Sequence, residues 1–179
     1  VTNADTAMYR VKKGQKGQYK FFNKNMIKKL QQKTKIKKIL RKALKNDGFK
    51  LKYQPQIDLH TGKVVSFEAL IRLENYDISP GKFIPVAEET GLIISIGRLV
   101  VKKALKQLDI WRKQGYELRT IAINFSAQQL NDDNFVEFLI RELEENNIEA
   151  ELLEIEITEG ILLEKEEKSI TFLNKLKKL

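Results

Sequence analysis

Residues 119–124 read RTIAIN, a short apolar run that predicts a β-strand buried on both faces. Helical spacing precedes this run over residues 97–111 and follows it over residues 135–143, and residues 152–158 then predict another strand. Helical spacing returns from residue 163. Strands that alternate with helices in this way lie parallel and are joined by crossover helices, so this part of the chain indicates an α/β fold.

The segment before it follows a different pattern. Residues 49–59 alternate apolar and polar side chains, Thr61-Gly62 supplies a turn, and residues 64–73 form another apolar run, which together predict an antiparallel hairpin. A short helix is expected at residues 83–87. Residues 24–47 carry apolar side chains at spacings of three and four, and this spacing predicts an amphipathic helix.

Three further expectations concern single side chains. Asp132 and Asp133 are expected in the first turn of the helix over residues 135–143, where carboxylates interact favourably with the helix dipole. Trp111 is expected in the core. His60, beside the hairpin turn, is expected to be exposed and inert.

The charge of the chain is divided between two segments. The 179 residues contain 33 Lys and Arg against 24 Asp and Glu, a net charge of +9. Residues 1–50 hold 16 basic and 2 acidic side chains, a net of +14, whereas residues 51–179 hold 17 basic and 22 acidic ones, a net of −5. A lysine run can bind nucleic acid or an anionic membrane, but no interleaved aromatic platform accompanies it. We therefore favour a connector helix with a solvated outer face, and expect neither partner for this segment.

Composition restricts the chemistry. Without cysteine, and with one histidine, the sequence excludes disulfides, thiolate-bound metals and paired-histidine metal sites, so any metal would need oxygen ligands. No apolar run is long enough to span a membrane. A complete (β/α)8 barrel needs about 250 residues, more than this chain has. The first residue is not Met, so we interpret the chain as a fragment of a longer polypeptide.

Polar side chains lie within or just after the predicted strands. Functional groups of parallel α/β sheets gather at the carboxyl ends of strands, where Glu68, Asn124 and Glu156 are candidates. A carboxylate inside an apolar run costs several kcal/mol unless it is paired or binds a metal, and hard cations accept such oxygen ligands. Arg72 would either neutralise Glu68 or bind a phosphate through two hydrogen bonds.

Simpler interpretations remain open for each candidate. Glu68 and Arg72 would form a salt bridge, Asn124 would be a helix N-cap or turn residue, and the glutamates from Glu154 to Glu159 would form a solvated face.

These residues belong to a set of short motifs that occur in order over residues 35–179. The motifs are Tyr53-Gln54-Pro55, Thr61-Gly62, Glu68-Ala69-Leu70-Ile71-Arg72, Phe83-Ile84-Pro85-Val86-Ala87-Glu88, Thr90-Gly91-Leu92-Ile93, Asn124-Phe125-Ser126 and Glu156-Ile157-Thr158-Glu159. Together they resemble the EAL domain. Residues 1–23 are similar to the last helix and strand of a GGDEF (diguanylate cyclase) domain. The resemblances divide the chain into a GGDEF remnant over 1–23, a connector helix over 24–47 and the N-terminal part of an EAL domain over 48–179.

The resemblance implies a fold and an activity. The fold would be a partial TIM-like (β/α)8 barrel with an antiparallel first strand, truncated after about half of the barrel. The activity would be that of a phosphodiesterase that hydrolyses cyclic di-GMP to linear pGpG with a water activated by divalent metal, Mg²⁺ or Mn²⁺. By the same resemblance the protein would be cytoplasmic, form a homodimer through the EAL domain, and belong to a parent that could be tethered to a membrane.

The resemblance also implies roles for single residues. Glu68, Asn124 and Glu156 match metal ligands. Gln54, Leu70 and Arg72 match positions that contact the nucleotide, Arg72 through a phosphate. Glu159 matches a residue that supports a neighbouring active-site loop.

The sequence departs from the family pattern after Leu179. The family segments that would follow Leu179 carry an Asp-Asp pair that bridges the two metals and, on later strands, a Lys, a Glu and a Gln, and these segments lie beyond the 179 residues. We therefore expect an open sheet with an exposed edge, half of a metal site and no turnover by this chain alone. The alternative function is a catalytically silent EAL module that senses cyclic di-GMP or mediates dimerisation.

Overall fold

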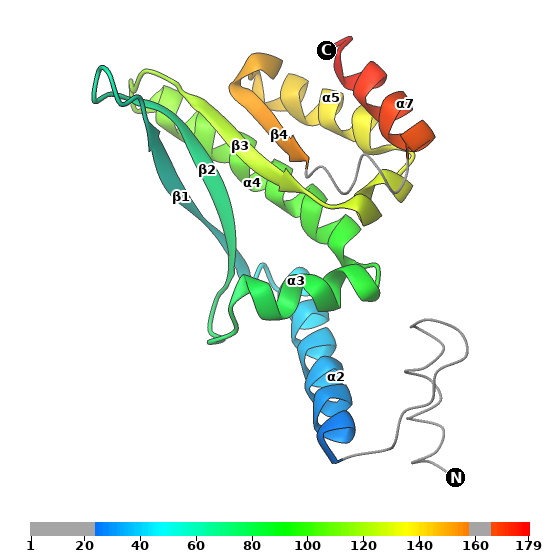
Figure 1. The fold of residues 1–179 in the computed structure, drawn as a ribbon. Helices are drawn as coiled ribbons and strands as arrows, with labels where there is room; N and C mark the ends of the chain where they lie inside the picture. The colour runs from blue at the N-terminus through cyan, green and yellow to red at the C-terminus, as the bar shows by residue number, and fades with distance from the viewer. Residues whose placement is uncertain (1–23, 158–165) are drawn as a thin grey trace.

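The computed structural model describes residues 24–157 and 166–179. Four strands form one open sheet in the order β1-β2-β3-β4, with β1 antiparallel to β2 and the other neighbours parallel (Figure 1). The predicted α/β class, hairpin and parallel strands are confirmed. The elements in chain order are α2 Lys24–Lys45, β1 Phe49–Ile57, β2 Val64–Leu73, α3 Pro80–Glu89, α4 Leu92–Lys113, β3 Thr120–Phe125, the 3₁₀ helix η1 Ala127–Asn131, α5 Phe135–Asn146, the 3₁₀ helix η2 Ala150–Leu152, β4 Leu153–Ile157 and α7 Glu166–Leu176.

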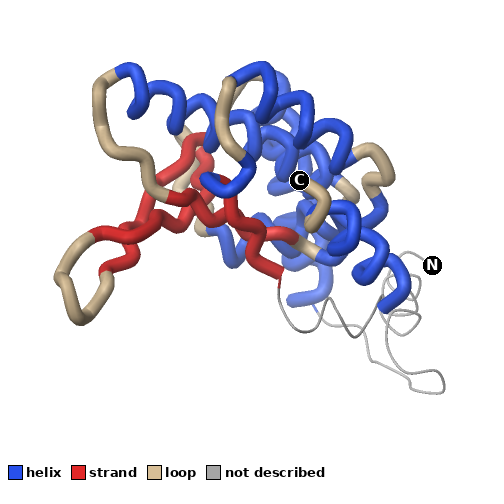
Figure 2. The backbone as a smooth tube through the Cα atoms, turned by 90° about the horizontal axis from the view of Figure 1, so that it is seen from above, coloured by secondary structure: helices blue, strands red, loops and turns tan. Residues whose placement is uncertain are grey.

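Strand register separates a polar face of the sheet from an apolar face. Glu68 of β2 is aligned with Gln54 of β1 and Ala122 of β3. Asn124, two residues beyond Ala122, is aligned with Glu156 of β4. Because side chains alternate along a strand, these residues share one face. The opposite face carries apolar side chains, and Figure 2 shows the helices gathered on one side of the strands.

Helix α4 supplies the largest part of the core. Its buried stripe is made of Ile93, Ile96, Gly97, Val100, Val101, Ala104, Leu105 and Leu108. The helix is longer than the predicted range of 97–111 because it begins directly after Gly91, whose left-handed backbone (φ 71°) ends the preceding turn. Trp111, near its end, is half-buried between Tyr53 and Phe67, with ring centroids 5.2 and 5.1 Å away.

Helix α2 confirms the predicted amphipathic helix. Ile36, Leu40 and Ala43 are buried in the same core as α4, and α2 contacts both α3 and α4. Its basic residues lie mostly on the exposed side, although Lys33 Nζ lies 2.6 Å from the Glu89 carboxylate of α3. The second half of this helix is therefore packed as part of the domain.

The prediction for Asp132 and Asp133 was wrong. Helix α5 begins at Phe135, as expected, but both aspartates precede its first turn: the unpredicted 3₁₀ helix η1 ends at Asn131, and Asp132 follows it with a non-helical backbone. Asp132 instead accepts hydrogen bonds from Nε and Nη2 of Arg98 at 2.7 and 2.6 Å. The Asp132 side chain is only 8% exposed, so this pair fastens α4 to the segment before α5.

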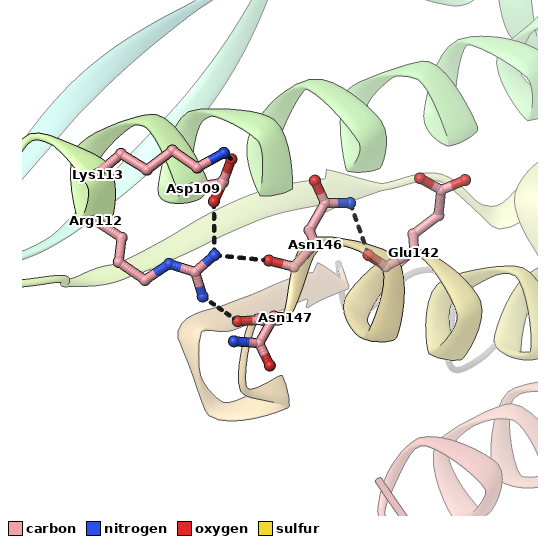
Figure 3. Close-up of polar contacts among 6 residues, drawn as sticks. All are labelled: Asp109, Arg112, Lys113, Glu142, Asn146 and Asn147. Carbon is pink, nitrogen blue, oxygen red and sulfur yellow. Dashed lines mark hydrogen bonds and ion pairs between the residues drawn. The ribbon is translucent and has the colours of Figure 1, made fainter.

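Arg112 joins the C-terminal ends of α4 and α5 (Figure 3). Its guanidinium donates hydrogen bonds to the backbone carbonyl oxygens of Asn146, at 3.0 Å, and Asn147. The same group contacts Asp109 at 2.6 Å, and hydrogen bonds from Lys113 and Arg112 hold the pKa of Asp109 below its usual value. Cations are favourable at helix C-termini, so Arg112 caps α5 from a neighbouring helix.

An aromatic cluster fastens α7 to β3 and α5. Phe125 stacks on Phe172 of α7 at 4.8 Å and meets Phe135 of α5 edge-on at 5.1 Å. Helix α7 confirms the helical pattern expected from residue 163 over its described part. His60 is exposed in the hairpin turn, as predicted. No helix in the described ranges is long and apolar enough to cross a membrane.

Candidate functional site

Glu68 and Asn124 meet on the polar face of the sheet. Glu68 Oε1 accepts a hydrogen bond of 2.8 Å from Asn124 Nδ2, although the two residues are 56 positions apart in sequence. Glu68 lies within β2 and Asn124 is the next-to-last residue of β3. Their contact follows from the parallel register, in which Glu68 is aligned with Ala122 and Asn124 lies one step further along the same face.

Glu156 adds a second carboxylate on the other side of Asn124. It is aligned with Asn124 in the β3–β4 ladder, so its side chain leaves the same face of the sheet. Burial, followed by the charges of Glu68 and Glu154, raises the pKa of Glu156 above its ordinary value. The polar face therefore concentrates negative charge at neighbouring positions, an arrangement that a cation would relieve.

The simpler interpretations of Glu68 and Asn124 do not describe this structure. Within the described residues, no ion pair joins Glu68 to Arg72, whose Nη1 donates to the backbone oxygen of Ile71 at 2.9 Å. The N-cap of the following 3₁₀ helix is Ser126. Glu154 is exposed, as a solvated face requires, but Glu156 is half-buried.

A cavity of about 670 Å³ opens beside the Glu68–Asn124 pair. Among the predicted site residues, Glu68, Leu70, Arg72 and Asn124 line it, together with apolar residues of α3 and α4. Gln54 and Glu156 share the polar face but are not among the lining residues. Glu159 lies outside the described residues. The structure thus brings four of the seven predicted site residues around one cavity.

The side chains on this face provide oxygen donors of the kind that hard cations bind. Glu68 and Glu156 are carboxylates, and Asn124 offers its amide Oδ1 while its Nδ2 holds Glu68. The described part of the chain forms no group of three or more His, Cys, Asp or Glu side chains suited to a metal. A donor set of two carboxylates and one amide suits a hard divalent cation that takes its remaining ligands from water.

Sequence reasoning missed the residues that form the turn after Asn124. Ser126 and Gln129 form a reciprocal capping box at the start of η1, and both line the cavity. The spacing Ser-x-x-Gln is a known sequence signature of this motif and would have predicted it. Glu88 of α3 also lines the cavity, and no role had been predicted for it.

Glu156→Gln should stabilise the metal-free protein at neutral pH. The folded state keeps a proton on Glu156 at a pH where the unfolded state has released it, so the stability conferred by this group falls as pH rises above the ordinary Glu pKa of about 4.3. Glutamine does not ionise and avoids this loss. Because the site is partly solvated, the gain should stay below about 1 kcal/mol.

Urea unfolding with a chelator present, at pH values of about 4 and 7, measures this effect. The free energy of unfolding of the variant should exceed that of the wild type only at the higher pH. Glu151→Gln, at an exposed position in η2, is the matched control. Equal stability of wild type and Glu156→Gln at both pH values would contradict the expectation.

The fold and the site together define an α/β domain with an open sheet and oxygen donors on adjacent parallel strands. The EAL domain profile matches residues 37–179, and the chain belongs to the EAL domain family. The chain is 40% identical over 164 residues to the signaling protein YkoW of Bacillus subtilis, and the aligned region covers 90% of this chain and 20% of that protein. It is 37% identical over 182 residues to the cyclic di-GMP phosphodiesterase PdeR of Escherichia coli, covering 100% of this chain and 27% of that protein. The chain thus spans about a quarter of the length of these relatives.

Solved structures support the same assignment. The PaMucR phosphodiesterase in its c-di-GMP complex superposes with a TM-score of 0.74 at 33% identity, covering 80% of this chain and 59% of that chain. The EAL domain of Xanthomonas citri FimX in complex with c-diGMP gives a TM-score of 0.73 at 26% identity. The superposition covers 82% of this chain and 57% of that chain. The described sheet therefore corresponds to part of an EAL TIM barrel, which confirms the predicted fold.

Proposed function

We propose that this chain forms part of a phosphodiesterase domain that hydrolyses cyclic di-GMP to linear pGpG. The supporting observation is the Glu68–Asn124 hydrogen bond with Glu156 in register beside it, in a chain of the EAL family. Two similar proteins are named as phosphodiesterases, which favours this activity over the silent-sensor alternative.

Glu68, Asn124 and Glu156 would hold the divalent metal, Mg²⁺ or Mn²⁺. When bound, such an ion lowers the pKa of a water and stabilises negative charge on phosphate oxygens. Asn124 orients Glu68 through its Nδ2, and the two carboxylates keep the site negative enough to attract cations. In the overall reaction, a water oxygen bonds to phosphorus, and the bond from phosphorus to the ribose 3′ oxygen breaks as that oxygen takes a proton.

Arg72, Leu70 and Gln54 would bind the nucleotide. Arg72 lines the cavity, and its guanidinium suits a phosphodiester oxygen. Leu70 contributes apolar surface for a base. Gln54, directly across from Glu68 on β1, supplies an amide at the side of the site.

The organisation of the parent protein belongs to the same proposal. Residues 1–23 would end a GGDEF domain, residues 24–47 would connect it to the EAL domain, and residues 48–179 would begin the EAL domain. Glu159 would support a loop beside the metal. In the parent protein this domain would lie in the cytoplasm. Two copies would associate through it, and light scattering of the full-length protein would detect the dimer.

The test is a metal-dependent assay of the full-length protein with cyclic di-GMP. With Mg²⁺ or Mn²⁺ we expect pGpG to accumulate, and with a chelator we expect none. Cyclic di-GMP binding without pGpG formation under any metal would instead establish the sensor function.

A further inference from the structure

We propose that Gln129 is a positioning residue for Asn124. Its side-chain amide, held between η1 and Gly97 of α4, fixes the turn that follows β3 and thereby keeps the Asn124 amide directed at Glu68. The inference rests on the proposed function, in which Asn124 and Glu68 hold the metal.

Gln129 makes a defined contact to the turn. Its side chain is 3% exposed, and its Oε1 accepts a hydrogen bond of 3.0 Å from the backbone N–H of Ser126. In return, Ser126 Oγ accepts a hydrogen bond of 3.3 Å from the backbone N–H of Gln128. A reciprocal capping box restrains both ends of the turn, so Ser126 has little freedom to move.

The Gln129 amide occupies the space that a side chain at residue 97 would fill. A Cβ atom at residue 97 would lie 2.0 Å from Gln129 Nε2 and 2.7 Å from its Cδ, so any other residue there would require the Gln129 amide to shift. Gly97 is itself buried in α4. The amide of Gln129 therefore packs directly on the helix backbone, and close packing of this kind leaves a side chain few alternative rotamers.

The restraint reaches Asn124 through two peptide units. The Asn124 side chain is exposed and its described hydrogen bond is to Glu68, so its direction depends on the backbone that carries it. Phe125, the next residue, is held on the apolar face by Phe135 and Phe172. Ser126 is held by Gln129. The two anchors fix the backbone on the carboxyl side of Asn124, where a metal ligand needs to be held in place.

The capping box would also stabilise the fold without any role in the site, and the two roles predict different results. A purely structural role lowers the stability of the protein and leaves its metal affinity unchanged. A positioning role lowers the metal affinity of protein that is fully folded. Residues that orient metal ligands from behind typically contribute 10-fold to 100-fold in affinity.

Titration calorimetry of Mn²⁺ into the full-length protein tests the proposal, with urea unfolding and steady-state kinetics on the same samples. Gln129→Met keeps the volume and loses the acceptor for the Ser126 N–H; we expect its Mn²⁺ affinity and kcat to fall about tenfold with little change in KM. Gln129→Glu keeps the acceptor and should restore the affinity. Gln128→Ala, at the adjacent exposed position, is the matched control and should bind as the wild type does.

Gly97→Ala provides a second route to the same displacement. Its added methyl group pushes the Gln129 amide away from α4, so Mn²⁺ affinity should fall as in Gln129→Met. Folded Gln129→Met or Gly97→Ala protein with wild-type Mn²⁺ affinity would overturn the positioning role. A wild-type protein that binds no Mn²⁺ would overturn the proposed function itself and this inference with it.

Discussion

Glu68→Gln should lower the turnover of cyclic di-GMP by the full-length protein about a thousandfold. A carboxylate ligand that stabilises developing charge through a metal contributes several kcal/mol, and each 1.4 kcal/mol corresponds to a factor of ten in rate. The substitution removes the negative charge but keeps an oxygen that can accept the hydrogen bond from Asn124 Nδ2, so the fold of the polar face should persist.

Measurement of kcat with saturating Mn²⁺, together with Mn²⁺ affinity from calorimetry, checks this result. Glu74→Gln is the matched control, because Glu74 follows the same strand and its side chain, 43% exposed, faces Lys50 at 3.7 Å. The control should retain wild-type kcat. Full activity in Glu68→Gln would remove Glu68 from the metal site.

Phe135→Ala should cost about 3 to 5 kcal/mol of unfolding free energy, the usual range for removing a buried phenylalanine. Phe135 is 1% exposed and contacts Phe125, Phe138 and Phe172 with centroid distances of 5.1, 6.1 and 5.9 Å. The cavity left behind would lie between β3, α5 and α7, where the surrounding rings cannot all close in.

Thermal and urea unfolding measure the loss, and the melting temperature should fall by roughly 10 °C for a domain of this size. Phe135→Leu keeps most of the volume and should cost less than half as much. A loss below about 1 kcal/mol for Phe135→Ala would show that the aromatic cluster does not hold α7 on the domain.

Much of the fold could be predicted because its signals are local. Alternating or apolar runs predict the hairpin and the strands β3 and β4, and apolar residues at helical spacing predict α2 and α5. The early start of α4 was missed because it depends on the left-handed backbone of Gly91. The 3₁₀ helix η1 was missed because five residues carry no periodicity, and Asp132 and Asp133 were therefore assigned to the first turn of the helix that begins at Phe135.

The sequence could predict that the candidate site residues lie near one another, but not which contacts they make. Parallel strands place Glu68, Asn124 and Glu156 at one edge, and that expectation needs no knowledge of distances. The hydrogen bond that joins Glu68 to Asn124 depends on register, and the contact of Gln129 with Gly97 depends on how η1 packs on α4. Neither is encoded in a local pattern, because each joins residues more than 30 positions apart.

The position of Trp111 gives the domain an internal optical probe. It is the only tryptophan in this sequence, and it lies between Tyr53 and Phe67 where the end of α4 meets the hairpin. The cavity that it lines shares no residue with the cavity at Glu68. Its fluorescence should therefore report the docking of α4 on the hairpin and remain silent to changes at the polar face. One emission spectrum can thus separate variants that have lost the fold from variants that have lost only a ligand.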